Sequence, residues 1–238
     1  MPQSNNYTTN SNKKQVLYII HGWTYTVEPW RQTIALLEKA GVSVKMLHVP
    51  GLTESSGKVW DIDGYQKWAD RQIPDEAVAL GHSNGGRILL NLCSNRPDKL
   101  KHLILLDAAG VYEKSRKRDM LRKLAKIGAP LKKSKVLRKI LHKAIGASDY
   151  SHAPENMKKT LANMLDSDKN LDFTKIQTPT TILWGKDDTV TPPRQAKVMH
   201  QKIASSKLRL FDGWTHAPYI SDSAGLAKSI LETLRELD

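Results

Sequence analysis

Residues 77–93 read AVALGHSNGGRILLNLC and contain the most informative pattern in this chain. The apolar run 77–80 is typical of a buried strand, and the segment from Gly86 to Cys93 has the composition of a helix. Between them lies Gly-x-Ser-x-Gly, with Ser83 at its centre. A serine on so tight a strand-to-helix turn is forced out of the sheet, and glycines leave room where backbones approach closely. Ser83 is therefore predicted to be a nucleophile.

Two further apolar runs precede the acid and the base that such a serine needs. Residues 180–184 are followed by the loop GKDDTVTP, and residues 207–211 are followed by a loop that leads to His216. Parallel strands end at one edge of a sheet, so the three loops are expected to meet there. The chain order of serine, acid and histidine separates this pattern from two other well-known serine protease folds.

These motifs resemble the α/β-hydrolase superfamily of serine hydrolases, and the resemblance extends from about residue 15 to the last residue. It implies an α/β fold of three layers, with a mostly parallel sheet, helices on both faces and a helical cap insert. Helical patterns at 29–40, 85–96, 193–203 and 222–237 alternate with strand-like runs, as βαβ units require. Three parts are predicted. Residues 1–15 form a disordered polar tail, residues 16–110 and 173–238 form the core domain, and residues 111–172 form a helical, basic cap insert.

The resemblance also implies which aspartate is the catalytic acid. Asp188 lies three residues after Gly185 and four before Pro192, which is the superfamily spacing. Asp187 is then a turn residue that faces solvent. Asp107, which follows an earlier apolar run, is the other candidate, because some relatives place their acid after that strand.

An oxyanion hole is implied by the strand-like run 16–20 and the segment His21-Gly22-Trp23 that follows it. Carried over from the superfamily, the donors are the backbone N–H groups of Trp23 and Asn84. Such donors are each worth about 3 kcal/mol in a transition state. The other expected neighbours of the pocket are His21, Gly22, His82 and Trp214.

The cap insert has two helical patterns, 114–127 and 134–145, separated by Gly128-Ala129-Pro130. Their apolar stripes are expected to pack on the core domain, and part of either could line an acyl pocket. The chain has a net charge of +13, with 37 lysines and arginines, and 13 of these lie within 111–147 beside only two acids. The basic face is interpreted as a solvated surface, with contact to anionic membranes or steering of anionic substrates as alternatives. Nucleic-acid binding is not expected, because no recognition motif accompanies the charge.

Composition sets the remaining expectations. Residues 1–15 lack the apolar segment of a secretory signal, and no run approaches the roughly 20 apolar residues of a membrane span, so a soluble cytoplasmic protein is predicted. The single cysteine, Cys93, excludes an internal disulfide and lies on an apolar helical pattern, which indicates core packing. No metal or other cofactor is expected, and the sequence does not determine the oligomeric state.

The resemblance implies hydrolysis of a carboxylic ester through an acyl-enzyme intermediate, with Ser83, Asp188 and His216 as the catalytic triad. The expected substrate is a small-molecule ester or another acyl compound. A carbon–carbon bond hydrolase, an acyltransferase and a thioesterase of the same fold are alternatives. A non-enzymatic, receptor-like ligand binder is an alternative from another class, although an intact catalytic set argues against it. Peptidase relatives need an acidic cap pocket for a substrate amine, which the basic insert does not offer.

Overall fold

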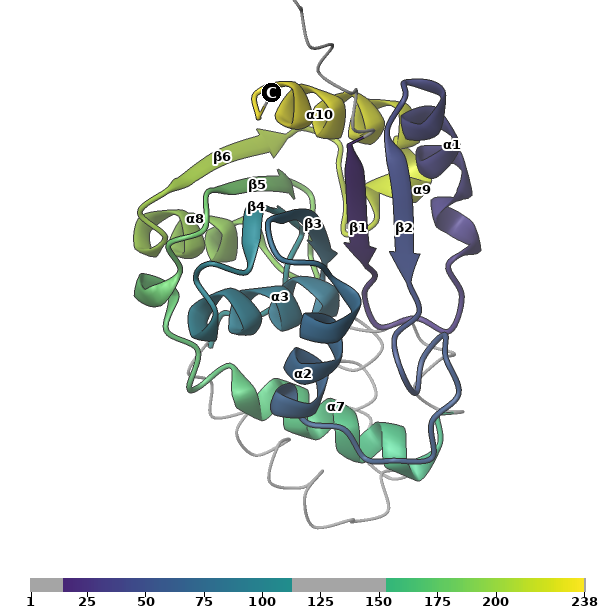
Figure 1. Cartoon of the computed structure of the whole chain (residues 1–238), viewed down its shortest axis with the longest axis vertical. Coiled ribbons are helices and arrows are strands. Elements are labelled where there is room, and N and C mark those ends of the chain that lie inside the picture. The colour runs from purple at the N-terminus through teal and green to yellow at the C-terminus, as the bar shows by residue number, and fades with distance from the viewer. Residues whose placement is uncertain (1–14, 113–152, 238) are drawn as a thin grey trace, which may run out of the picture.

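The computed structural model describes residues 15–112 and 153–237 of the chain (Figure 1). The elements in chain order are β1 (Val16–Ile20), η1 (Glu28–Trp30), α1 (Arg31–Lys39), β2 (Ser43–Leu47), α2 (Ile62–Gln72), β3 (Ala77–His82), α3 (Asn84–Asn95), β4 (Leu100–Leu106), α7 (Glu155–Ser167), η3 (Phe173–Lys175), β5 (Thr180–Gly185), α8 (Pro193–Lys202), β6 (Ser206–Phe211), α9 (Pro218–Ser221) and α10 (Ser223–Arg235).

The described strands form one sheet in the order β2-β1-β3-β4-β5-β6, and every neighbouring pair is parallel. The chain therefore moves outward from β1 to β2, returns to β3 beside β1, and continues in the opposite direction. Ligands of open parallel sheets bind at such a reversal, beyond the carboxyl ends of the strands. The reversal lies between β1 and β3, whose loops carry His21 and Ser83.

Helices cover both faces of the sheet, because successive strand residues point to opposite sides. Leu17 and Ile19 of β1 pack in a core cluster with residues of α1 and α10. Tyr18 and Ile20 pack on the other face with residues of α2, α3 and α8. Both clusters are buried, which matches the continuous apolar runs of the strands. The predicted three-layer α/β architecture, a parallel sheet with helices on both faces, is confirmed.

Helix α3 runs through the interior directly after the serine, and its residues from Asn84 to Cys93 are all buried. Cys93 is fully enclosed, as its apolar position predicted, and burial raises the pKa of its thiol to about 12. A reactive thiol would need the opposite environment.

Helix α7 packs against α2 and contributes Met157, Leu161 and Met164 to the main core cluster (Figure 1). The Thr160 hydroxyl oxygen accepts a hydrogen bond from the Trp60 backbone N–H at 2.9 Å, which joins α7 to the loop before α2. The predicted cap helices 114–127 and 134–145 and the tail up to residue 14 lie outside the described residues. Across 15–112 and 153–237, no helix has the length and apolar character needed to cross a membrane.

Candidate active site

Ser83 lies on the turn between β3 and α3 with φ 49° and ψ −116°. A positive φ is unfavourable for a residue with a Cβ, so neighbouring groups must hold it in place. The Ser83 backbone N–H donates to the Leu106 carbonyl at 3.1 Å, and the Ser83 carbonyl accepts from Ala109 N–H at 2.9 Å. The turn is thereby fixed to the end of β4, and its side chain is presented at the sheet edge, as predicted.

Glycines make this turn possible because the backbone of β1 passes close to it. A Cβ at Gly85 would overlap the Ile20 carbonyl, and one at Gly81 would lie 2.6 Å from the Gly86 Cα. Real Cβ atoms do not approach so closely, so a side chain at either glycine would push α3 away from the sheet. The flanking glycines of the motif are required by packing.

His216 lies between Ser83 and Asp188, in the loop that joins β6 to α9. Its Nε2 is 2.9 Å from Ser83 Oγ, and its Nδ1 is 2.8 Å from Asp188 Oδ2. A carboxylate can only accept, so it fixes the tautomer with the proton on Nδ1 and leaves Nε2 to accept from the serine hydroxyl. The structure brings together the three side chains that the sequence predicted to act together.

Asp188 is 3% exposed and receives several hydrogen bonds in addition to that from His216. Its Oδ1 accepts from Val190 N–H at 2.6 Å and from Thr191 N–H at 3.0 Å, and its Oδ2 accepts from the Thr191 hydroxyl at 2.6 Å. Burial by itself would raise the pKa of Asp188, but His216 and these donors outweigh it and hold the pKa below the usual value. Asp188 is therefore a stable carboxylate facing the imidazole.

The two other candidate acids lie elsewhere. Asp187 is exposed and accepts from Gly213 N–H at 3.1 Å, which matches its predicted place in a turn. Asp107 is fully buried behind Asp188, and its Oδ1 accepts from Gly185 N–H at 2.8 Å. Of the three aspartates, Asp188 is the one whose side chain hydrogen-bonds to His216 Nδ1.

The candidate oxyanion donors lie where β1 and α3 approach each other. A Cβ at Gly22 would lie 3.0 Å from Ser83 Cβ, so the segment that leads to Trp23 passes directly beside Ser83. Asn84 is the first residue of α3, and its N–H is one of the donors that the helix itself leaves unpaired. The positive end of the helix dipole adds to the attraction for an anion there.

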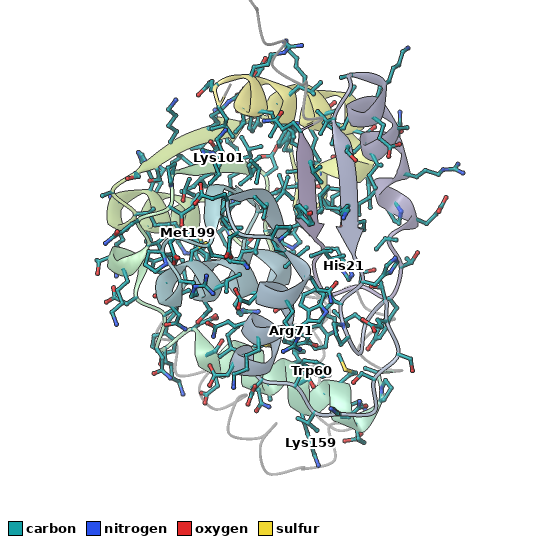
Figure 2. All side chains as sticks on the ribbon, in the orientation of Figure 1. His21, Trp60, Arg71, Lys101, Lys159 and Met199 are labelled. Carbon is teal, nitrogen blue, oxygen red and sulfur yellow. The ribbon has the colours of Figure 1, made fainter. Side chains whose placement is uncertain are left out.

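Buried histidines support both sides of this site. His82 Nε2 donates to the His216 carbonyl at 2.8 Å, and its ring contacts those of Trp30 and Tyr219. Burial, followed by the nearby His216, lowers the pKa of His82 to about 3, so the ring is neutral. His21 lies at the carboxyl end of β1 (Figure 2), where its Nε2 is 2.7 Å from Thr53 Oγ1. Burial lowers the pKa of His21 to about 4.

Trp214 supports the loop that carries His216. Its ring stacks on Phe211 with centroids 3.9 Å apart, and its Nε1 donates to Asp222 at 2.8 Å. It is 4% exposed. This expected pocket neighbour is thus packed into the core cluster shared by α1 and α10.

Sequence reasoning missed Thr191 and the buried ion pair between Arg87 and Asp168. Arg87 Nε and Nη2 donate to the two carboxylate oxygens of Asp168 at 2.7 and 3.1 Å, and both side chains are 5% exposed. Arg87 Nη1 also donates to Asn84 Oδ1 at 2.6 Å. An arginine one turn after the serine was the available signal, but its partner is 81 residues away in sequence.

The family model described as "Serine aminopeptidase, S33" matches residues 11–222. A pimeloyl-[acyl-carrier protein] methyl ester esterase of Neisseria meningitidis serogroup C is 27% identical over 89% of this chain and 90% of its own length. A protein of the same name from Vibrio campbellii is 22% identical over 91% of this chain and 93% of its own length.

Solved structures resemble the fold. The monoacylglycerol lipase of Paleococcus ferrophilus aligns with a TM-score of 0.69 and 18% identity, over 94% of this chain and 95% of the lipase. A thermophilic esterase of Thermogutta terrifontis aligns with a TM-score of 0.67 and 19% identity, over 94% of this chain and 90% of the esterase.

Proposed function

Since this chain belongs to the serine aminopeptidase S33 family of α/β hydrolases, we propose that it hydrolyses carboxylic esters through a covalent acyl-enzyme. The observation that carries the proposal is the continuous hydrogen-bonded chain from Ser83 through His216 to Asp188, with links of 2.9 and 2.8 Å. A nucleophile, a base and an orienting acid at these distances meet the geometric requirement for nucleophilic acyl transfer.

In the first half of the reaction, Ser83 Oγ attacks the ester carbonyl carbon while its proton moves to His216 Nε2. Asp188 stabilises the imidazolium that forms and keeps its Nδ1–H directed away from the substrate. The tetrahedral intermediate then collapses: the bond from carbon to the alcohol oxygen breaks, and His216 returns the proton to that oxygen. The alcohol leaves, and the acyl group remains on Ser83.

The negative charge on the carbonyl oxygen is assigned to the backbone N–H groups of Asn84 and Trp23. Support comes from the position of Asn84 at the start of α3 and from the close approach of Gly22 to Ser83. Fixed donors of this kind require no reorganisation during the reaction, which makes them effective for transition-state charge.

In the second half, His216 takes a proton from water, and the resulting hydroxide attacks the acyl carbon. Collapse of this intermediate breaks the bond to Ser83 Oγ, which regains its proton from His216. The products are the carboxylic acid and the free enzyme.

The proposed substrate class is a methyl ester on an acyl chain that is joined to a carrier. Support comes from the curated relatives, which span nearly the whole chain and are named pimeloyl-[acyl-carrier protein] methyl ester esterases. Hydrolysis of a methyl ester releases methanol and a free carboxylate. The family description names a peptidase, but the esterase relatives and the basic insert both favour an ester substrate over a peptide amine.

The proposed reaction is tested with a panel of 4-nitrophenyl esters of rising chain length and with a dicarboxylic monomethyl ester, free and carrier-linked. We expect repeated turnover and a higher kcat/KM for the carrier-linked ester. Ser83→Ala should lower kcat by about four orders of magnitude or more, because the nucleophile is lost. Ser205→Ala, at an exposed serine away from the site, is the matched control and should retain activity.

Covalent labelling identifies the nucleophile directly. A serine-directed phosphonate should add one label, at Ser83, in the wild-type protein and in Ser205→Ala. Labelling at another serine, or full activity of Ser83→Ala, would contradict the assignment. A single turnover without release would instead favour the receptor-like binder, and preference for a thioester or a carbon–carbon bond would redirect the substrate class.

A further inference from the structure

Asp107 is a buried carboxyl that the proposed mechanism does not use. It follows β4 with φ +43°, and no part of its surface is exposed. Its Oδ1 accepts from Gly185 N–H at 2.8 Å, while its Oδ2 is enclosed and receives no N–H or O–H donor from the described residues. Its carbonyl oxygen lies 3.0 Å from the Thr191 hydroxyl oxygen.

The carboxylate of Asp188 is the charged neighbour of the Asp107 side chain. Thr191 connects the two residues, because its hydroxyl lies 3.0 Å from the Asp107 carbonyl oxygen and 2.6 Å from Asp188 Oδ2. Neighbouring carboxyl groups that are both buried disfavour each other's negative charge. We therefore expect one of the two to hold a proton.

The two carboxyl groups have very different partners. Asp188 accepts four hydrogen bonds and faces the imidazole of His216, all of which favour the ionised form. Asp107 has one backbone donor, and within residues 15–112 and 153–237 no lysine, arginine or histidine forms an ion pair with it. A buried carboxylate with one donor and no cation is strongly disfavoured, so the proton belongs on Asp107.

We propose that Asp107 carries a proton and donates it in a hydrogen bond to Asp188, which makes Asp107 a positioning residue for the catalytic acid. The proton resides on Oδ2, the oxygen that no other group satisfies, while Oδ1 remains the acceptor for Gly185 N–H. The role in catalysis rests on the proposed function, but the protonation state does not.

The electrostatic surroundings agree with this geometry. Burial raises the pKa of Asp107 well above its ordinary value, the Gly185 N–H opposes this effect, and the charge of Asp188 raises the pKa further. Tyr219 faces Asp107 from α9, and burial raises the pKa of its phenol to about 12, so this neighbour is also neutral. Beyond Asp188 lies His216, whose Nδ1 donates to that carboxylate.

Two consequences follow for the triad. The imidazolium that forms during catalysis faces one negative charge, on Asp188. The proposed hydrogen bond from Asp107 also restrains the Asp188 carboxylate, so that its Oδ2 stays directed toward His216. The backbone N–H groups of Val190 and Thr191 hold the other oxygen. An orienting group that cannot rotate is what a tautomer-fixing acid requires.

The test compares Asp107→Asn with Asp107→Ala. Asparagine keeps an acceptor for Gly185 N–H, supplies an N–H donor toward Asp188, and tolerates a positive φ. We expect Asp107→Asn to keep kcat/KM within about threefold, and Asp107→Ala to lose about tenfold or more, as for one hydrogen bond to a charged group.

The pH–rate profile separates a neutral donor from a buried charge. If Asp107 is protonated, the acid limb of kcat/KM should lie at the same pH in Asp107→Asn and in wild type. If Asp107 were ionised, removing its charge would disfavour protonation of the catalytic base, and the limb would move down by about one pH unit or more. Such a shift, or a loss in Asp107→Asn as severe as in Asp107→Ala, would overturn the proposal.

A measurement without substrate keeps the two proposals apart. Carboxyl ¹³C NMR of aspartate-labelled protein, assigned by difference with Asp107→Asn, should show the Asp107 signal at the protonated position throughout pH 5 to about 8. A signal that is ionised in this range would refute the inference even in an active enzyme. A protonated Asp107 in a protein without ester turnover would uphold the inference on protonation and refute the proposed function.

Discussion

Asp187 and Asp188 are adjacent in sequence and opposite in environment. Asp188 is 3% exposed and joins His216, whereas Asp187 is exposed and accepts one backbone N–H from Gly213. The difference arises because the loop after β5 turns between them, which sends one side chain into the site and the other outward. This adjacent pair offers a matched comparison for the role of the acid.

Asp188→Asn should lower kcat by about three to four orders of magnitude, because an amide neither fixes the productive tautomer nor stabilises the imidazolium. Asp187→Asn should leave kcat within about threefold, because its contact is exposed. Steady-state kinetics on a 4-nitrophenyl ester measures both. A nearly normal kcat in Asp188→Asn together with a large loss of kcat in Asp187→Asn would show that the acid has been misassigned.

The sequence predicted the residues whose roles follow from local spacing. Ser83 was identifiable from its flanking glycines, and Asp188 because its distances to Gly185 and Pro192 match the pattern of the superfamily that the chain resembles. Thr191 gave no such signal, because its importance comes from a hydroxyl that meets Asp107 and Asp188 only after β4 and β5 pair. Contacts made between strands cannot be read from the sequence of one loop.

Helix α3 is held to α7 by the buried pair of Arg87 and Asp168. Asp168 is the C-cap residue directly after α7, so the pair connects the helix that follows Ser83 to the end of α7. The third contact of Arg87, with Asn84, lies at the start of α3. The pair thereby links the position of α7 to the first turn of α3, the helix that follows Ser83.

Arg87→Met and Asp168→Leu should each lower the free energy of unfolding by about 3 kcal/mol, because each leaves a buried charge without its partner. The double variant should lose less than the sum of the two, since no charge is stranded. Urea unfolding of the wild type, the two single variants and the double variant measures these losses. Arg31→Met, which removes the exposed pair with Glu28, is the control and should change stability little. Additive losses would show that the two side chains do not act as a pair.

The elements that were predicted are those with clear periodicity or apolar runs. The helical pattern predicted at 222–237 corresponds to α10, Ser223–Arg235, and the apolar run 180–184 corresponds to β5. Helix α2 was not predicted. It starts at Ile62 after an Asp61 cap that accepts from Gly64 N–H at 2.8 Å, and its polar composition conceals the face formed by Tyr65, Trp68 and Ala69.

At the scale of the whole molecule, the two packed faces of the sheet enclose histidines that must stay neutral. His82 and His21 lie at the site, and His102 lies on β4 with its Nε2 2.9 Å from Thr181 Oγ1. Burial lowers the pKa of His102 to about 4, with Lys207 adding to the effect. In the unfolded chain each of these residues would take up a proton near pH 6.5.

Stability should therefore fall as the pH is lowered from about 6.5 toward 4. In this window the unfolded state binds protons that the native state does not, so each such histidine lowers the free energy of unfolding by up to about 1.4 kcal/mol per pH unit. Urea unfolding at several pH values measures the slope. His102→Gln, away from the site, should reduce the slope of the free energy of unfolding against pH by the contribution of one histidine. An unchanged slope would show that His102 is protonated in the native state.

The architecture was predictable because apolar runs that alternate with helical patterns imply a parallel sheet with two covered faces. The order of the strands was not, since β1, β2 and β3 are successive in sequence while β1 lies between the other two. The predicted cap helices and the basic face of 111–147 lie outside the described residues apart from Val111 and Tyr112, so they remain predictions.

The strand order also places the candidate catalytic groups on parts of the sheet with unequal support. Ser83 follows β3, which has strands on both sides. The loop of His216 follows β6, an edge strand of the described sheet, which pairs with β5 on one side and is partly exposed along its length. Native-state hydrogen exchange should therefore differ between them. The Ser83 and Ala109 amides should exchange only through global unfolding, while amides of β6 should exchange through smaller openings. Ser83 would then stay in place during fluctuations that move His216 away and back. A transient loss of activity therefore need not involve unfolding of the turn that carries Ser83.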